Sequence, residues 1–316
     1  MSPLGERWEP MEDDRPAAEA APPDPDHPTL GVVQGVGAFL WWGIVTSCYF
    51  KWLDRVSPWE LLAWRVLGGL PVLLLILAFR RDLASLGVAF RDRATRRTLL
   101  LSTLLISANW FCFIIAVVTE RLREGSLGFL INPLISVLLG VFILGERLRT
   151  PQAVAVGLAA VGVSLLTWSQ GALPVLALIL ATVSAVYGLL RKRMPAGPTT
   201  GLCLEMLALF PAMLALQVYL TVRGETLFLR DAEVTFGLFV GGVVTIVPLV
   251  LFASSARRLR LSTVGLLQYI SPTAQLLLAV LAFGEEFTRW HAISFSIIWV
   301  AAGLYTFDSV RHAPRR

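Results

Sequence analysis

Long runs of apolar residues alternate with short polar connections along nearly the whole chain after residue 30. Each run has about the 20 residues that a helix needs to cross the hydrocarbon core of a bilayer. The apolar–polar alternation of a transmembrane β-barrel, in segments of about ten residues, is absent. The pattern predicts an all-α polytopic membrane protein with ten transmembrane helices, at residues 31–50, 58–79, 98–119, 123–144, 151–170, 173–190, 199–221, 233–255, 262–283 and 290–308.

Composition supports the same class. Hydrophobic residues make up 56% of the 316-residue chain, charged residues 16%, and the mean hydropathy is +0.69. So few charged residues cannot cover the surface of a soluble protein of this length. The net charge of +5 would suggest nucleic acid as a partner of a soluble protein. Here the basic residues stand mainly in short connections, so we expect a lipid bilayer and no nucleic acid as partner, and a homo-oligomer stays open.

The basic residues also predict the orientation. Connections on one side of the predicted membrane, with the C-terminal tail, hold 17 Lys and Arg residues, and those on the other side hold 7. Because basic connections stay in the cytoplasm, both termini are predicted to be cytoplasmic. An even number of spans also places both termini on the same side of the membrane.

Residues 1–29 are rich in Pro, Ala and acidic residues and lack the basic and apolar regions of a signal peptide, which predicts a disordered cytoplasmic tail. Two five-helix repeats are expected at 30–170 and 171–309, and a cytoplasmic C-terminal tail at 310–316.

The division into repeats comes from one segment that occurs twice. INPLISVLLGVFILGE at 131–146 and ISPTAQLLLAVLAFGE at 270–285 each place a glycine twelve residues after a proline. RLREGSLG at 121–128 and RLRLSTVG at 258–265 precede them. Because each half has an odd number of spans, the halves would be antiparallel, which makes an inverted repeat of the kind found in many secondary transporters.

Proline removes a backbone hydrogen bond from a helix and bends it. The freed carbonyl needs a partner inside the protein, so such bends are tolerated against other helices or a wet cavity. Matched bends at Pro133 and Pro272 would flank a central cavity. The alternative is that they only assist packing.

Several strings resemble the EamA family of the drug/metabolite transporter superfamily, and within it the chloramphenicol-sensitive RarD-type permeases. These strings are WWGI (41–44), ANWFCFIIAV (108–117), GSLGFLINPLISVLLGVFILGERLR (125–149), YGLLRKRM (187–194) and RRLRLSTVGLLQYISPT (257–273). The resemblance covers residues 31–308. It implies two five-span repeats, a substrate path between spans 1–4 and 6–9 with spans 5 and 10 peripheral, and permease-type movement of small metabolites or drugs.

Charged residues inside spans are candidates for function because lipid penalises them. Arg65 lies in span 2 and either faces the cavity, where it would attract an anionic group, or extends to the outer interface. Glu205 in span 7 either carries a coupling proton or caps its helix. Glu60 is expected at the outer interface. For Glu146 and Glu285, which end their spans, we expect capping or a salt bridge to Arg147 or Arg289.

Polar and aromatic residues within spans complete the candidate site. The amides and hydroxyls either line the cavity or hold helices together. Trp41, Trp42, Trp110 and Tyr187 are aromatic candidates. The predicted substrate-binding residues are Trp42, Arg65, Asn109, Trp110, Asn132, Tyr187, Glu205, Gln268, Tyr269 and Ser271.

The sequence predicts a secondary transporter that moves a small molecule by alternating access, without cofactor or bound metal. No zinc pattern, phosphate loop or nucleophile elbow indicates an enzyme. A non-transporting structural or sensory membrane subunit is the main alternative. An intramembrane enzyme would need clustered acids or histidines at one membrane face, and a channel would need a charged ring or a filter motif.

Overall fold

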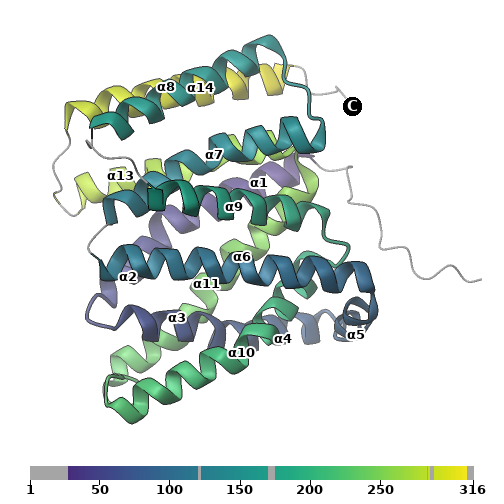
Figure 1. Cartoon of the computed structure of the whole chain (residues 1–316), viewed down its shortest axis with the longest axis vertical. Coiled ribbons are helices and arrows are strands. Elements are labelled where there is room, and N and C mark those ends of the chain that lie inside the picture. The colour runs from purple at the N-terminus through teal and green to yellow at the C-terminus, as the bar shows by residue number, and fades with distance from the viewer. Residues whose placement is uncertain (1–27, 120–121, 170–174, 283, 285–287, 312–316) are drawn as a thin grey trace, which may run out of the picture.

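The computed structural model describes residues 28–119, 122–169, 175–282, 284 and 288–311, and the regular structure in these ranges is helical. Figure 1 shows the arrangement. In chain order the elements are α1 (Pro28–Leu40), the π-helical turn η1 (Trp41–Val45), α2 (Thr46–Trp52), α3 (Pro58–Leu67), α4 (Gly69–Phe79), α5 (Ala84–Arg91), α6 (Arg93–Val118), α7 (Leu122–Leu144), α8 (Thr150–Ser169), α9 (Val175–Arg193), α10 (Pro198–Arg223), α11 (Ala232–Arg258), α12 (Leu261–Leu267), α13 (Ile270–Leu281) and α14 (Arg289–Arg311).

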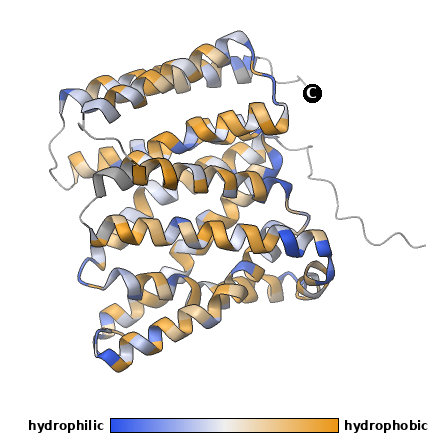
Figure 2. Ribbon diagram, in the orientation of Figure 1, coloured by the Kyte–Doolittle hydropathy of each residue, from blue (hydrophilic) through white to orange (hydrophobic). Residues whose placement is uncertain are grey.

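Ten segments of the described chain are long and apolar enough to cross a membrane, which confirms the predicted number. Large apolar side chains cover their outward faces, and Phe79, Phe142 and Trp168 are exposed by 86%, 79% and 81%. Figure 2 shows polar residues gathered mainly near helix ends. Such apolar surfaces would aggregate in water and suit contact with lipid. The protein is therefore a multi-pass membrane protein.

The spans run roughly side by side (Figure 1). We call the end where α1 begins and α14 ends the terminal face, and the opposite end the distal face. Helices α8 and α14 pack on each other along one edge of the bundle. Gly162 allows this approach, since a Cβ there would lie 2.9 Å from the carbonyl oxygen of Ser294. Spans 5 and 10 are thus peripheral, as the resemblance implies.

The connection between spans 2 and 3, at 80–97, contains the short helix α5. Helix α5 contacts α6 and α10, and the hydroxyls of Ser85 and Thr200 lie 2.9 Å apart. Asp92 follows α5 and accepts a hydrogen bond from the backbone N–H of Thr95 at 2.7 Å. Hydrogen bonds from the side chain and backbone of Thr95 lower the pKa of Asp92, so the charged carboxylate caps α6 at neutral pH.

The two spans that carry the repeated segment differ. Helix α7 continues through Pro133, so the predicted bend does not interrupt it. Span 9 breaks into α12 and α13 at Gln268 and Tyr269. Pro272 has no N–H to offer the carbonyl of Gln268, and the N–H of Ser271 donates to that carbonyl instead, at 3.1 Å. The helix tightens to a 3₁₀ turn there, as expected where a proline removes the regular bond.

Two further spans are irregular. In span 1 the N–H of Thr46 donates to the carbonyl of Trp41, which closes the π turn η1. In span 2 the helix is divided at Gly68 into α3 and α4. Gly68 lies against Gly242 of α11. A Cβ on Gly242 would be 2.3 Å from both the carbonyl carbon and the carbonyl oxygen of Gly68. The two backbones are in direct contact, so α11 and span 2 have no room for a side chain between them.

This contact gives a stability prediction. Replacing Gly242 with alanine should destabilise the fold by about 3 kcal/mol, because the added methyl meets backbone and no side chain can move aside. The measurement is the unfolding midpoint of the purified protein in detergent. Gly157→Ala is the control, since a Cβ on Gly157 meets nothing within 4 Å. Equal midpoints for the two variants would contradict the backbone contact.

Candidate functional site

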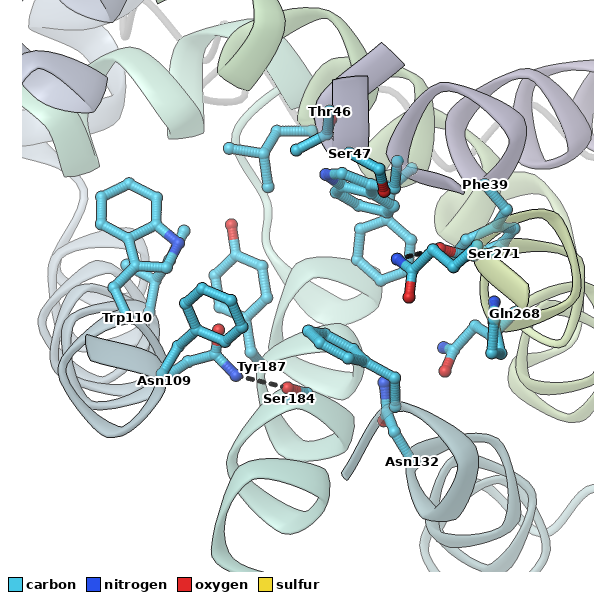
Figure 3. A pocket seen from close by; sticks show the side chains of 18 of the residues that line it. Phe39, Thr46, Ser47, Asn109, Trp110, Asn132, Ser184, Tyr187, Gln268 and Ser271 are labelled. Atoms are coloured by element: carbon cyan, nitrogen blue, oxygen red, sulfur yellow. Dashed lines mark hydrogen bonds between the residues drawn. The ribbon is translucent and has the colours of Figure 1, made fainter. Parts of the chain in front are cut away.

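A cavity of about 380 Å³ lies inside the bundle, with walls from spans 1–4, 6, 8 and 9. Figure 3 shows side chains from these helices pointing into a shared space. The lining residues are Phe39, Trp42, Thr46, Ser47, Phe50, Arg65, Ile106, Asn109, Trp110, Phe113, Phe129, Asn132, Ser184, Tyr187, Leu249, Phe252, Gln268, Ser271, Pro272 and Gln275.

The irregular turns of spans 1 and 9 lie against each other beside the cavity. A Cβ on Gly43 of η1 would lie 2.9 Å from the carbonyl oxygen of Ser271 and 2.6 Å from the Cβ of Ala274. Turns of this type change which side chains a helix presents to one face, and they are frequent at functional sites. Here they bring Trp42, Gln268 and Ser271 to the same cavity.

Neutral polar side chains form part of the wall. Asn109 donates to Ser184 Oγ at 2.6 Å (Figure 3), and Gln275 Nε2 is 3.4 Å from Ser271 Oγ. Gln268 makes one long contact, from Nε2 to Ser136 Oγ at 3.5 Å, and its buried Oε1 has no hydrogen-bond partner. An unsatisfied buried amide oxygen is costly. The wall therefore keeps hydrogen-bonding capacity for a guest molecule.

Aromatic rings form another part of the wall. Phe39, Trp42 and Phe252 are in mutual contact, with ring centroids 5.7 to 6.1 Å apart. Such rings offer large, rigid apolar surface at low entropic cost. Trp41, also considered from sequence, instead donates through Nε1 to the carbonyl of Val244 at 3.1 Å and is not among the lining residues.

Arg65 lines the cavity from α3, the position that the first of its two sequence-based alternatives describes. Its guanidinium carbon lies 4.7 Å from the ring centroid of Trp110 and 5.9 Å from that of Phe50. These are cation–π distances. The geometry holds a positive charge against the aromatic wall.

Eight of the ten residues predicted to form the site line this cavity. Their role in binding a substrate remains a prediction. The eight are Trp42, Arg65, Asn109, Trp110, Asn132, Tyr187, Gln268 and Ser271.

Glu205 lies elsewhere, buried in a cluster behind Tyr187. It accepts hydrogen bonds from Ser102 Oγ at 2.6 Å and the Tyr187 hydroxyl at 3.1 Å, and pairs with Arg191 at 3.4 Å. A second nitrogen of Arg191 donates to the carbonyl of Pro198 at 2.7 Å. Three donors already occupy the carboxylate, an arrangement typical of an internal ion pair.

Tyr269 is also outside the cavity. It is 2% exposed, packs in the cluster that contains Leu127, Ala177 and Leu266, and its hydroxyl has no hydrogen-bond partner. Tyr269 and Gln268 are neighbours in the chain, so their side chains leave the backbone in different directions, and only Gln268 meets the cavity.

Sequence reasoning also missed polar lining residues. Gln275 follows Gln268 by seven residues and Ser271 by four, so the three share a helix face, and Ser184 precedes Tyr187 by three. This periodicity could have identified them. Thr46 and Ser47 carried no such signal, because the π turn before them shifts the register of span 1.

Hydrogen bonds join the two halves of the chain at the terminal face. Glu146 follows α7 and accepts from the backbone N–H groups of Leu261 and Ser262, at 2.6 and 2.9 Å, and from the Ser262 hydroxyl at 2.7 Å. It does cap a helix, as one alternative proposed, but the helix is α12 of the other half. Gly140 leaves space for this carboxylate, since a Cβ there would lie 2.7 Å from Glu146 Oε2. Glu285 lies outside the described residues.

Glu60 is buried near the distal face. Its carboxylate accepts from the Thr226 hydroxyl and from the backbone N–H groups of Leu227 and Phe228, both at 3.1 Å. It therefore anchors the α10–α11 connection onto α3. The expected location near the start of the span is right, whereas the side chain is fully enclosed by protein.

Within the described ranges, no three His, Cys, Asp or Glu side chains are grouped so that they could hold a metal ion. The cavity wall is aromatic and neutral-polar with one guanidinium, which suits reversible binding of an organic molecule.

A buried polar cavity among ten apolar helices is typical of a membrane transporter, and comparisons with known proteins agree. The EamA-like transporter family matches residues 29–168 and again 173–307. A Vibrio cholerae protein named uncharacterized transporter is 40% identical over 93% of this chain and 98% of its own length. Protein RarD of Escherichia coli is 36% identical over 89% of this chain and 95% of its own.

The fold is also found in a solved crystal structure. It matches with a TM-score of 0.70 at 19% identity, over 88% of this chain and 98% of the other. The chain belongs to the EamA-like transporter family and is a membrane transporter.

Proposed function

We propose that the protein is a secondary transporter that carries a small metabolite or drug through the central cavity by alternating access. The cavity supports this most strongly: it combines aromatic rings, one unsatisfied amide oxygen and one charge at membrane depth. A structural subunit would gain nothing from unsatisfied polar groups there, because lipid and protein both penalise them.

The position of the cavity between the two halves of the chain supports alternating access. The lining residues of α6 and α7 lie toward the distal face, and bonds between the two halves, such as Glu146 to α12, lie at the terminal face. Arg258 Nη1, 3.3 Å from Gln34 Oε1, adds another such bond. Bonds also join the halves at the distal face, from Glu60 to the α10–α11 connection, so breaking one set at a time would direct the cavity to one face. Rocking of two inverted repeats would direct it to the other face.

The two separate family matches, at 29–168 and 173–307, support a division into repeats. The excess of Lys and Arg at the terminal face, 17 against 7, supports cytoplasmic termini in a bacterial inner membrane. The distal face would then be periplasmic.

Flux measurements test the proposed function. Purified protein in proteoliposomes should transport at least one member of a panel of metabolites and drugs, with and without a pH gradient. Absence of flux above that of protein-free liposomes for every compound would favour a structural or sensory subunit.

Asn109 offers a sharper test within the same assay. The Asn109→Leu side chain has nearly the same volume as asparagine but cannot form hydrogen bonds. Flux should fall at least about tenfold, because one polar contact to the substrate is lost. Membrane insertion and protein yield should stay unchanged. Ser107→Ala on the same helix is the control, since Ser107 bonds only its own helix at the carbonyl of Thr103, at 2.7 Å. Full flux in Asn109→Leu would remove Asn109 from the substrate path.

A further inference from the structure

Arg65 differs from the other arginines that are at least partly buried. Arg191, Arg257 and Arg258 each donate to a backbone carbonyl or a side-chain oxygen. Arg65 makes no hydrogen bond or ion pair with the residues that the structure describes, and its buried Nε has no partner. Its guanidinium faces the cavity and touches aromatic rings only.

The residues around Arg65 do not neutralise it. Of the described lining residues, none is an aspartate or a glutamate, and Glu205 is already paired with Arg191. Cation–π contacts with Trp110 and Phe50 offset only part of the cost of holding a charge away from bulk water. An uncompensated guanidinium in an enclosed site is a fixed attraction for an anion, and its planar fork suits a carboxylate.

We propose that the cavity binds a small organic anion, a carboxylate with a flat aromatic body, whose anionic group lies on Arg65. This deepens the proposed function and rests on it. The aromatic body would pack against Phe39, Trp42 and Phe252, and the amide of Gln268, which lines the same cavity, would bond a further polar group of the ligand. The volume of about 380 Å³ limits the ligand to a small molecule.

Binding to the purified full-length protein gives the first test. Aromatic carboxylates would be titrated by calorimetry beside their neutral carboxamides, which match them in shape. We expect at least one acid to bind about tenfold or more tightly than its amide, as for a charge-assisted bond. Arg65→Gln should abolish this preference, and Arg65→Lys should keep part of it. Equal affinities within every pair, or no binding by any acid, would overturn the inference.

A second test needs no ligand and remains valid if Arg65→Gln binds poorly for other reasons. Ser47 lines the cavity, and Ser47→Cys would be made in a chain whose Cys48, Cys112 and Cys203 are replaced by serine. Anionic and cationic methanethiosulfonate reagents would then compete for this thiol. The quantity measured is the labelling rate of the anionic reagent divided by that of the cationic reagent. With Arg65 present, this ratio should be at least about tenfold higher for the Ser47→Cys thiol than for a free thiol in solution. A ratio near one, or one unchanged by Arg65→Gln, would overturn the inference.

The outcomes separate this inference from the proposed function. Flux of neutral compounds, with no acid preferred over its amide, would overturn the anion site and leave the transporter intact. Tight binding of acids that depends on Arg65, without flux of any compound, would support the anion site and overturn transport.

Discussion

Replacing Glu146 with alanine is expected to open the terminal face of the cavity. The Glu146 carboxylate accepts three hydrogen bonds from Leu261 and Ser262, and these bonds join the first half of the chain to α12 in the second. Loss of roughly 3 kcal/mol from a closed state would shift a two-state equilibrium about 100-fold. An impermeant thiol reagent applied at the terminal face should then label Ser47→Cys at least about tenfold faster.

Two matched variants test whether the lost hydrogen bonds cause the faster labelling. Arg147→Ala removes an exposed neighbour and should leave the labelling rate unchanged. Glu146→Gln keeps one good acceptor without the charge, so its rate should be intermediate. If Glu146→Ala is labelled no faster than Arg147→Ala, the bonds to α12 do not hold the terminal face closed.

Replacing Glu205 with alanine is expected to destabilise the protein by roughly 3–5 kcal/mol, the usual cost of leaving one partner of a buried ion pair alone. Arg191 is 2% exposed and its Nε already lacks a partner, so it cannot turn to water. Gly201 adds to the confinement, since a Cβ there would lie 2.6 Å from Arg191 Nη1. The unfolding midpoint in detergent measures the effect.

The double variant Glu205→Ala with Arg191→Met is the control for this ion pair. It removes both charges and fills the space of the arginine stem, so most of the lost stability should return. If the double variant is less stable than Glu205→Ala alone, the charge of Arg191 is not what destabilises the single variant.

The ten spans could be predicted because hydropathy over about 20 residues reports directly on contact with lipid. Their internal breaks could not. Pro272 interrupts its span and Pro133 does not, although their sequence contexts are alike. Both spans are closely packed, but against different neighbours: a Cβ on Gly128 of α7 would lie 3.0 Å from the Cβ of Leu180, and one on Gly265 of α12 would lie 2.9 Å from the carbonyl oxygen of Pro133. Such contacts depend on which helices become neighbours, and one sequence does not contain that information.

The candidate site was predictable to the extent that polar and aromatic residues inside spans must face protein or a cavity. This reasoning placed Asn109, Asn132 and Gln268 correctly on the wall. It did not place Glu205, because Glu205 pairs with Arg191 near the end of α9 and hydropathy carries no sign of that pairing. Only the rotation of a helix decides between facing a cavity and facing another side chain, and hydropathy does not report rotation.

Accessibility of Ser47→Cys from each face tests the central claim, a cavity that opens alternately to the two sides of the membrane. The variant, free of its other cysteines, would be labelled with a membrane-impermeant maleimide in right-side-out and in inside-out vesicles. We expect labelling from both faces, with Glu146→Ala shifting the ratio toward the terminal face. Labelling from neither face, or from the distal face alone in both proteins, would contradict alternating access through this cavity.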